Sequence, residues 1–142
     1  MRNLDIAKEY LLKNDLNFVI VKDGQVIEES SSRGIKPIYE TYKNNVKYFE
    51  GASVADRVIG KAAAMFLVSG GIKELYTDLI SELAIEILEN DDIVVNYSKK
   101  VPMILNRAQD DMCPIEKLSS QTNDVYKLVE EISNFLNNIK VN

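Results

Sequence analysis

The residue that is the clearest candidate for a chemical reaction is Cys113, the single cysteine of the chain. It is followed by Pro114 and Glu116. Proline suits the first position of a helix and glutamate the third, so this spacing predicts that a helix begins here with Cys113 as its N-cap. The unpaired N–H groups of a helix N-terminus favour the thiolate, which is the nucleophilic form of cysteine. Cys113 is therefore a candidate catalytic residue with Glu116 beside it. The alternative is that Cys113 is a small buried apolar side chain.

A second group of candidates surrounds the expected start of a long helix over residues 53–69. Ser53 and Asp56 have the spacing of a capping box, with Asp in place of the usual Glu. Helix N-termini attract anions and polar ligands, because their N–H groups are unpaired and carry partial positive charge. We expect a ligand site here, formed together with the start of a second helix over residues 79–90. Besides Glu116, the candidate ligand-binding residues are Ser53, Arg57, Asp78 and Ser81. The alternative is that Ser53 and Asp56 only cap their helix.

Two further features could serve a ligand. Lys61 lies within a largely apolar stretch, where a partly desolvated amine could act as a base or as a Schiff-base nucleophile. The alternative for Lys61 is a buried stem with its charged end in solvent. Residues 31–34, Ser-Ser-Arg-Gly, could hold a phosphate in a nest of backbone N–H groups.

The chain contains no histidine, and this excludes several kinds of chemistry. Histidine is the usual general base near neutral pH and the commonest metal ligand, so neither a Ser-His-Asp triad nor a Cys-His dyad can form. With one cysteine as well, the chain lacks the ligands for a zinc site of the usual nitrogen and sulfur kind. A carboxylate site for Mg²⁺ or Ca²⁺ is still chemically allowed. We expect neither a metal nor a cofactor.

Composition limits the class of protein. A chain of 142 residues with 46% hydrophobic residues is enough for one domain with a core, spanning residues 1–142. Its net charge of −5 does not favour binding to nucleic-acid polymers or anionic membranes. No apolar run approaches the roughly 20 residues that cross a bilayer, and the N-terminus has no signal-peptide core. We therefore expect a cytoplasmic protein.

The order of elements predicts the fold. Asp23-Gly24 lies between two β-rich runs, which is the strongest short signal of a hairpin. The remaining runs alternate between helical and strand patterns, so we expect a three-layer α/β/α sandwich with a mixed five-stranded sheet. The expected helices begin near residues 4, 37, 53, 79, 114 and 124, and the expected strands cover residues 17–22, 25–28, 72–77, 92–97 and 103–105.

Two stretches carry a resemblance to a known family: GASVADRVIGKAAA at residues 51–64 and MCPIEKL at residues 112–118. Together they resemble an uncharacterised bacterial and archaeal domain-of-unknown-function family whose fold is cytidine-deaminase-like. The resemblance covers most of the chain, from Leu4 to about residue 139. It implies a ligand cleft where the second and third helices point their N-termini.

The chain departs from true zinc deaminases at their metal motifs. In those enzymes H-x-E opens the second helix and P-C-x-x-C opens the third. Here Val54 stands where the histidine ligand would be, and Asp56 stands where the general acid/base Glu would be, which makes Asp56 a further catalytic candidate. The start of the expected third helix, at Asp78, has no cysteine. The resemblance therefore implies a fold and a cleft without zinc-dependent deamination.

Three functions follow from these observations. The first is binding of a small polar metabolite, nucleoside- or nucleotide-like, in the cleft at the N-termini of helices 53–69 and 79–90. The second is a thiol-dependent enzyme or sulfur carrier that uses Cys113, assisted by Asp56, Lys61 or Glu116. The third is a non-catalytic regulatory or assembly protein, in which the apolar stripe of the last helix pairs with a second chain and forms a homodimer.

Overall fold

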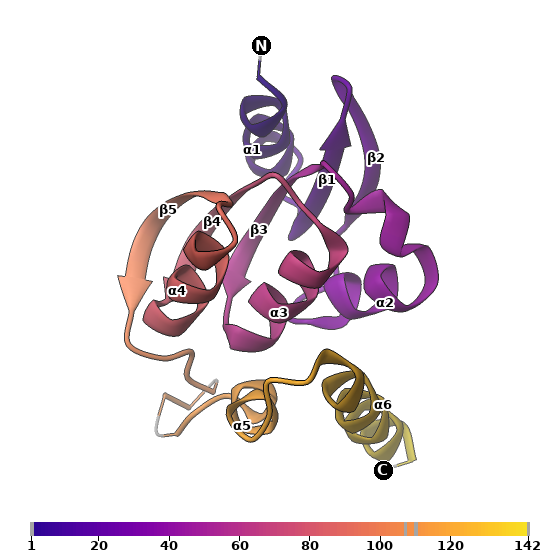
Figure 1. Cartoon of the computed structure of the whole chain (residues 1–142), viewed down its shortest axis with the longest axis vertical. Helices are drawn as coiled ribbons and strands as arrows, with labels where there is room; N and C mark the ends of the chain where they lie inside the picture. Colours follow the sequence, from indigo (N-terminus) through magenta and orange to yellow (C-terminus); the bar gives the residue numbers. More distant parts are fainter. Residues whose placement is uncertain (1, 107, 110, 142) are drawn as a thin grey trace.

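The computed structural model describes residues 2–106, 108–109 and 111–141, which form an α/β/α sandwich around one mixed sheet (Figure 1). The described elements are α1 (Asn3–Lys13), β1 (Phe18–Lys22), β2 (Gln25–Ser30), α2 (Lys36–Asn45), the 3-10 turn η1 (Val46–Tyr48), β3 (Ser53–Ile59), α3 (Lys61–Gly70), β4 (Glu74–Ser81), α4 (Glu82–Asn90), β5 (Val94–Val101), α5 (Pro114–Ser120) and α6 (Val125–Val141).

The strands of the described chain lie in the order β2-β1-β3-β4-β5. Strand β1 pairs antiparallel with β2 and β3, whereas β3, β4 and β5 run parallel to one another. The expected mixed five-stranded sheet is thus confirmed. The β1–β2 turn has positive φ at both Asp23 and Gly24, 49° and 75°, as a type I′ turn requires and as the Asp-Gly pair predicts.

Helices cover both faces of the sheet. Helix α1 lies behind the sheet in Figure 1 and buries Leu4, Ala7 and Leu11 against it. The other face is covered by α2, α3 and α4, whose apolar side chains form the larger core with β1, β3 and β4. Helices α5 and α6 lie below these layers in Figure 1, and Leu128 and Ile132 of α6 join the larger core. Burial on both faces is typical of parallel strands crossed by helices.

The expected helix over residues 53–69 is wrong in its first half. Residues 53–59 form the central strand β3, and the helix α3 begins only at Lys61, with Gly60 as its N-cap. The first four residues of β3, Ser53 to Asp56, are all buried, so the strand shows no alternation of buried and exposed positions. A short run buried on both faces cannot be distinguished from a buried helix by periodicity, and this caused the error.

Other boundaries also differ from the expectation. Helix α4 begins at Glu82 instead of residue 79, because β4 continues to Ser81. Residues 103–105 do not belong to the sheet; Leu105 makes only an isolated bridge with Met112. The fifth strand of the sheet is β3, which the sequence pattern had assigned to a helix.

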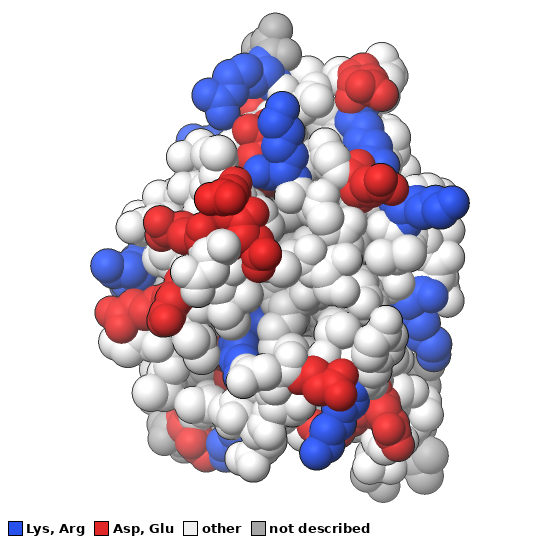
Figure 2. Space-filling model, in the orientation of Figure 1, with Lys and Arg blue, Asp and Glu red and all other residues white. Residues whose placement is uncertain are grey.

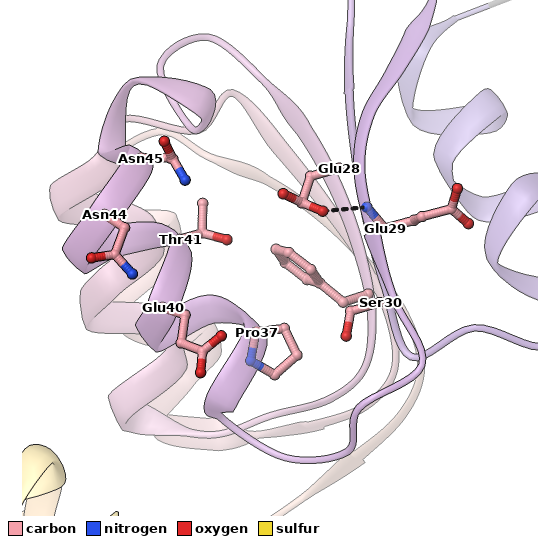
Figure 3. Close-up of a pocket in the computed structure, with 9 residues that line it drawn as sticks. Glu28, Glu29, Ser30, Pro37, Glu40, Thr41, Asn44 and Asn45 are labelled. Atoms are coloured by element: carbon pink, nitrogen blue, oxygen red, sulfur yellow. Dashed lines mark hydrogen bonds between the residues drawn. The ribbon is translucent and has the colours of Figure 1, made fainter.

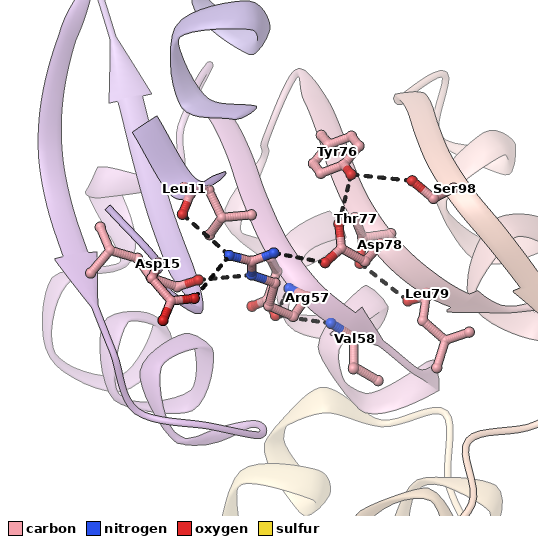
Figure 4. Close-up of polar contacts among 11 residues, drawn as sticks. Leu11, Asp15, Arg57, Val58, Tyr76, Thr77, Asp78, Leu79 and Ser98 are labelled. Carbon is pink, nitrogen blue, oxygen red and sulfur yellow. Dashed lines mark hydrogen bonds and ion pairs between the residues drawn. The ribbon is translucent and has the colours of Figure 1, made fainter. Parts of the chain in front are cut away.

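Arg57 of β3 connects the C-terminal end of α1 to the sheet through hydrogen bonds (Figure 4). Its guanidinium donates hydrogen bonds to the backbone oxygens of Leu11 (3.3 Å) and Leu16 (2.8 Å), just where α1 ends. It also pairs with Asp78 of β4, at 2.9 Å between Nη1 and Oδ2. A cation at the C-terminus of a helix satisfies carbonyl groups that have no partner within the helix. The half-buried guanidinium therefore joins β3, β4 and α1.

The surface shows no broad charged area on the face drawn in Figure 2, where acidic and basic side chains alternate around uncharged regions. Among the described residues, no helix is both long enough and apolar enough to cross a membrane.

Removing the Arg57 contacts should destabilise the fold. We expect Arg57→Gln to lower the free energy of unfolding by about 2 kcal/mol, because charge-assisted hydrogen bonds in a half-buried site are lost. Urea denaturation followed by circular dichroism measures this. Arg33→Gln is the matched control, since Arg33 is exposed and should change stability by less than about 0.5 kcal/mol. Equal effects of the two substitutions would contradict this role of Arg57.

Candidate functional site

The carboxyl ends of β3, β4 and β5 lie at one edge of the sheet, where α3 and α4 begin. The chain leaves β5 at Val101 and crosses this edge as α5, which lies just below the strands in Figure 1. Ligands of open α/β sheets bind outside the carboxyl ends of the strands, so a ligand site is expected at this edge.

A cavity of about 370 Å³ lies at this edge, between the N-termini of α2 and α3 and the segment that crosses from β5. Its wall is mainly apolar and includes one carboxylate, one guanidinium and one thiol. The lining residues are Arg33, Gly34, Ile35, Ile38, Val58, Gly60, Ala62, Ala63, Ile104, Leu105, Cys113, Ile115 and Glu116. A concave apolar site with a few convergent polar groups is typical of small-molecule binding.

The carboxylate of Glu116 caps helix α3 from a distant part of the chain. Its Oε1 accepts a hydrogen bond of 2.6 Å from the backbone N–H of Lys61, which lies 55 residues earlier. The N-cap residue of α3 is Gly60, which has no side chain to provide this bond. A Cβ at Gly60 would lie 2.2 Å from Oε1 of Glu116, so only glycine lets the carboxylate approach this closely. Glu116 is 8% exposed.

Cys113 lies where the sequence pattern predicts, as the N-cap of α5 with Pro114 in the first turn. Its backbone N–H donates to the carbonyl of Ile104 at 2.9 Å, which holds the two ends of the crossing segment together. The residue is half-buried and lines the same cavity as Glu116. The structure therefore brings these two candidates to one site.

Asp56 is a buried residue of β3 and does not cap a helix, so its expected position at a helix start is wrong. It is 5% exposed, and its Oδ1 accepts the backbone N–H groups of Arg57 (2.6 Å) and Val58 (3.2 Å). Burial raises the pKa of Asp56 to about 8, although the two backbone hydrogen bonds and the nearby Arg57 act in the opposite direction. Asp56 is not among the residues that line the cavity, but Val58, two residues further along β3, is.

Lys61 contributes its backbone to the site. The residue is buried, and its ammonium group makes no hydrogen bond or ion pair with any other described residue. It is not among the residues that line the cavity. A catalytic amine at Lys61 stays a prediction, without a contact that connects it to the cavity.

The remaining candidates lie apart from the cavity. Ser53 lies at the opposite end of β3, about 20 Å along the strand, and donates a 2.6 Å hydrogen bond to Glu74. Arg57 and Asp78 pair with each other and with neighbouring groups on the side of the sheet that faces α1 (Figure 4). Ser81 is the N-cap of α4 and accepts the N–H of Ala84. Ser53, Arg57 and Asp78 lie on strands, so their expected position at the starts of helices 53–69 and 79–90 is wrong. Only Ser81 lies at the start of a helix.

Several lining residues were missed because they come together only in the folded chain. Arg33 and Gly34, considered above as a phosphate nest, lie just before α2 and form part of the wall. Gly60 could have been recognised, because a glycine between a β-rich run and an alanine-rich run is typical of a strand-to-helix boundary. Ile104 and Leu105 gave no signal beyond a short apolar run.

A second, smaller cavity of about 220 Å³ lies between β2 and α2 (Figure 3). Its wall includes the carboxylates of Glu28 and Glu40 and the amides of Asn44 and Asn45. Within the described ranges, no three His, Cys, Asp or Glu side chains are grouped so as to hold a metal ion. The cavity at the carboxyl edge is larger and combines apolar walls with charges of both signs, so it is the stronger candidate.

The raised pKa of Asp56 has a consequence for stability. A carboxyl group whose pKa rises from 3.8 when unfolded to about 8 when folded stabilises the fold fully only below pH 3.8. Its contribution is lost as pH rises through about 8, because the folded state then has to bury a carboxylate. We expect Asp56→Asn to match the wild type near pH 4 and to exceed its free energy of unfolding by a few kcal/mol at pH 8.5.

Urea denaturation at a series of pH values measures this difference. Asp91→Asn, in an exposed turn, is the control and should follow the wild-type profile. Parallel profiles for the wild type and Asp56→Asn would show that Asp56 is ionised in the folded protein across this range.

Comparisons with known proteins place the chain in a family. Residues 6–136 match the family described as TM1506, domain of unknown function DUF1893. The crystal structure of a DUF1893 family protein (TM1506) from Thermotoga maritima is similar, with a TM-score of 0.83 and 30% identity over 94% of this chain and 90% of that chain.

A more distant structure is a diaminohydroxyphosphoribosylaminopyrimidine deaminase/5-amino-6-(5-phosphoribosylamino)uracil reductase from Thermotoga maritima. It gives a TM-score of 0.44 and 18% identity over 72% of this chain and 33% of that chain. A search of curated proteins gave no match. The match over residues 6–136 shows that this chain belongs to the DUF1893 (TM1506) family.

Proposed function

We propose that this protein binds a small polar metabolite, nucleoside- or nucleotide-like, in the cavity between the N-termini of α2 and α3. The observation that carries the proposal is the composition of that cavity. Apolar side chains form most of its wall, Glu116 lies against the α3 N-terminus, and Arg33 lies at the start of α2. Its volume of about 370 Å³ is in the range of small-molecule sites.

The location agrees only in part with the cleft expected at the N-termini of helices 53–69 and 79–90. Helix α3, the helical part of residues 53–69, begins at the cavity, whereas no α4 residue is among the described lining residues and the start of α2 lies there instead. Apolar side chains of Ile35, Ile38 and Val58 could contact the flat face of a base. A phosphate or another anion could pair with Arg33, whose guanidinium matches phosphate geometry.

The chemistry of this site would differ from that of zinc deaminases. Helix α2 begins with Lys36-Pro37-Ile38 and α3 with Lys61-Ala62-Ala63, so neither start carries the histidine or cysteine ligands of those enzymes. We therefore propose recognition of the ligand without deamination by zinc-activated water.

A thiol-dependent reaction is a second candidate, and one observation favours it. Cys113 lines the cavity together with Glu116, so a bound metabolite would contact a thiol and a carboxylate at once. A thiolate there could add to a polarised double bond of the ligand, forming a C–S bond while the π electron pair of that double bond moves to its other atom, which is then protonated.

Blocking the cavity tests the first proposal. Val58 is 41% exposed and lines the cavity, so Val58→Phe should fill it without disturbing the core. We expect the fluorescent anion 1-anilinonaphthalene-8-sulfonate to bind the wild type at one site and to bind Val58→Phe at least roughly tenfold more weakly. Val94→Phe is the control, because Val94 is 51% exposed on β5 and does not line the cavity.

Ligand identity follows from displacement of the same dye by nucleosides and nucleoside monophosphates, with stabilisation of the fold measured in parallel. We expect one of these compounds to displace the dye from the wild type and to stabilise it. The same compound should not stabilise Val58→Phe. If none displaces the dye or raises the melting temperature at millimolar concentration, the nucleotide-like ligand is wrong.

Alkylation tests the thiol candidate. We expect iodoacetamide to label Cys113 in the folded protein, with intact mass as the readout, and a saturating amount of the dye to slow the labelling. Labelling only after unfolding would show a buried structural thiol and would remove the thiol reaction from consideration.

A further inference from the structure

The free oxygen of Glu116 distinguishes this carboxylate from an ordinary helix cap. Oε1 is occupied by the N–H of Lys61, but Oε2 accepts no hydrogen bond from any other described residue. Although Oε2 has no hydrogen-bond partner among the described residues, it is not fully buried, so water can reach it. Glu116 is nine-tenths buried and lines the cavity, so the cavity borders its carboxylate.

The contacts of Glu116 account for one of its two carboxylate oxygens. The missing side chain of Gly60 and the bond to the α3 N-terminus hold one oxygen against the backbone. The other oxygen is then left for a hydrogen bond from a ligand, and a carboxylate oxygen only accepts hydrogen bonds. A ligand group opposite it must therefore be a donor.

Arg33 provides the complementary feature at the same cavity. It lies just before α2 and is exposed, and its guanidinium makes no hydrogen bond or ion pair within the described part of the chain. A free guanidinium in the wall of a cavity favours an anionic group of the ligand. The apolar side chains Ile35, Ile38 and Val58 belong to the same wall.

We propose that the ligand has two unlike ends: an amine or amidine N–H group that binds Oε2 of Glu116, and an anionic group that binds Arg33, joined by an apolar body. This inference rests on the proposed function, since it concerns the same cavity. It goes further because it assigns the polarity of the ligand and one recognising residue to each end.

Two simple probes separate the two ends. Benzamidine carries a cationic N–H donor on an apolar ring, and its dissociation constant can be measured by NMR titration. 1-Anilinonaphthalene-8-sulfonate carries an anion on apolar rings and is measured by fluorescence. Benzyl alcohol, which has the ring without the cation, is the control for apolar binding.

We expect opposite responses from two variants. Glu116→Gln should weaken benzamidine about tenfold, because a charge-assisted hydrogen bond is lost, and should leave the dye unchanged. Its amide oxygen can still accept the N–H of Lys61, so the fold should persist. Arg33→Gln should weaken the dye several-fold and leave benzamidine unchanged. Glu82→Gln, an exposed carboxylate in the first turn of α4, should change neither.

The inference is overturned if benzamidine binds the wild type no more tightly than benzyl alcohol does, a comparison that needs no variant. It is also overturned if Glu116→Gln changes the benzamidine affinity by less than twofold. In both cases, the proposed function stands if the wild type binds the dye and Val58→Phe does not. Loss of that dye response as well would remove the proposed function itself.

Discussion

The contact on which the site depends is the hydrogen bond between the carboxylate of Glu116 and the backbone of Lys61. Helix α3 starts at a glycine and therefore has no cap of its own, while a carboxylate from α5 provides one. This single contact satisfies one N–H group of the α3 N-terminus and links α5 to it over the carboxyl edge of the sheet. It also encloses a cavity whose wall comes from three separate parts of the chain.

Strand β3 contributes both to the anchoring of α1 and to the wall of the cavity within seven residues. Arg57 is directed to the side of the sheet that carries α1 and holds that helix in place. Asp56, next to it, is buried, its Oδ1 accepts the backbone N–H groups of Arg57 and Val58, and its burial favours the neutral form. Val58 and Gly60, after the point where β1 stops pairing, form part of the cavity wall. This segment thus anchors α1 with Arg57 and lines the cavity with Val58 and Gly60.

The sequence predicted those parts of the fold that local chemistry decides. The Asp-Gly hairpin, helix α1, the start of α5 at Cys113-Pro114 and the long last helix are confirmed, because the pattern that marks each of them lies within its own short stretch of the chain. Strand β3 was missed because burial on both faces removes the alternation that marks a strand. The error also moved the expected site, since Ser53 and Asp56 were placed at a helix start that lies at Lys61.

Of the candidate site residues, Cys113 and Glu116 meet at the cavity, and both were found from the start of a helix. Arg33 and the apolar wall reach the cavity through tertiary contacts between distant segments, which no local pattern encodes, whereas Gly60 has the local pattern of a strand-to-helix boundary. The amide resonances of Gly34, Gly60 and Lys61 offer the most direct measurement of the central claim. Titration with 4-(aminomethyl)benzoate, which has an amine and an anion on one apolar ring, should shift these three amides together. Shifts confined to the β2–α2 cavity near Glu28 and Asn44, or no shifts at all, would contradict a ligand site at the carboxyl edge.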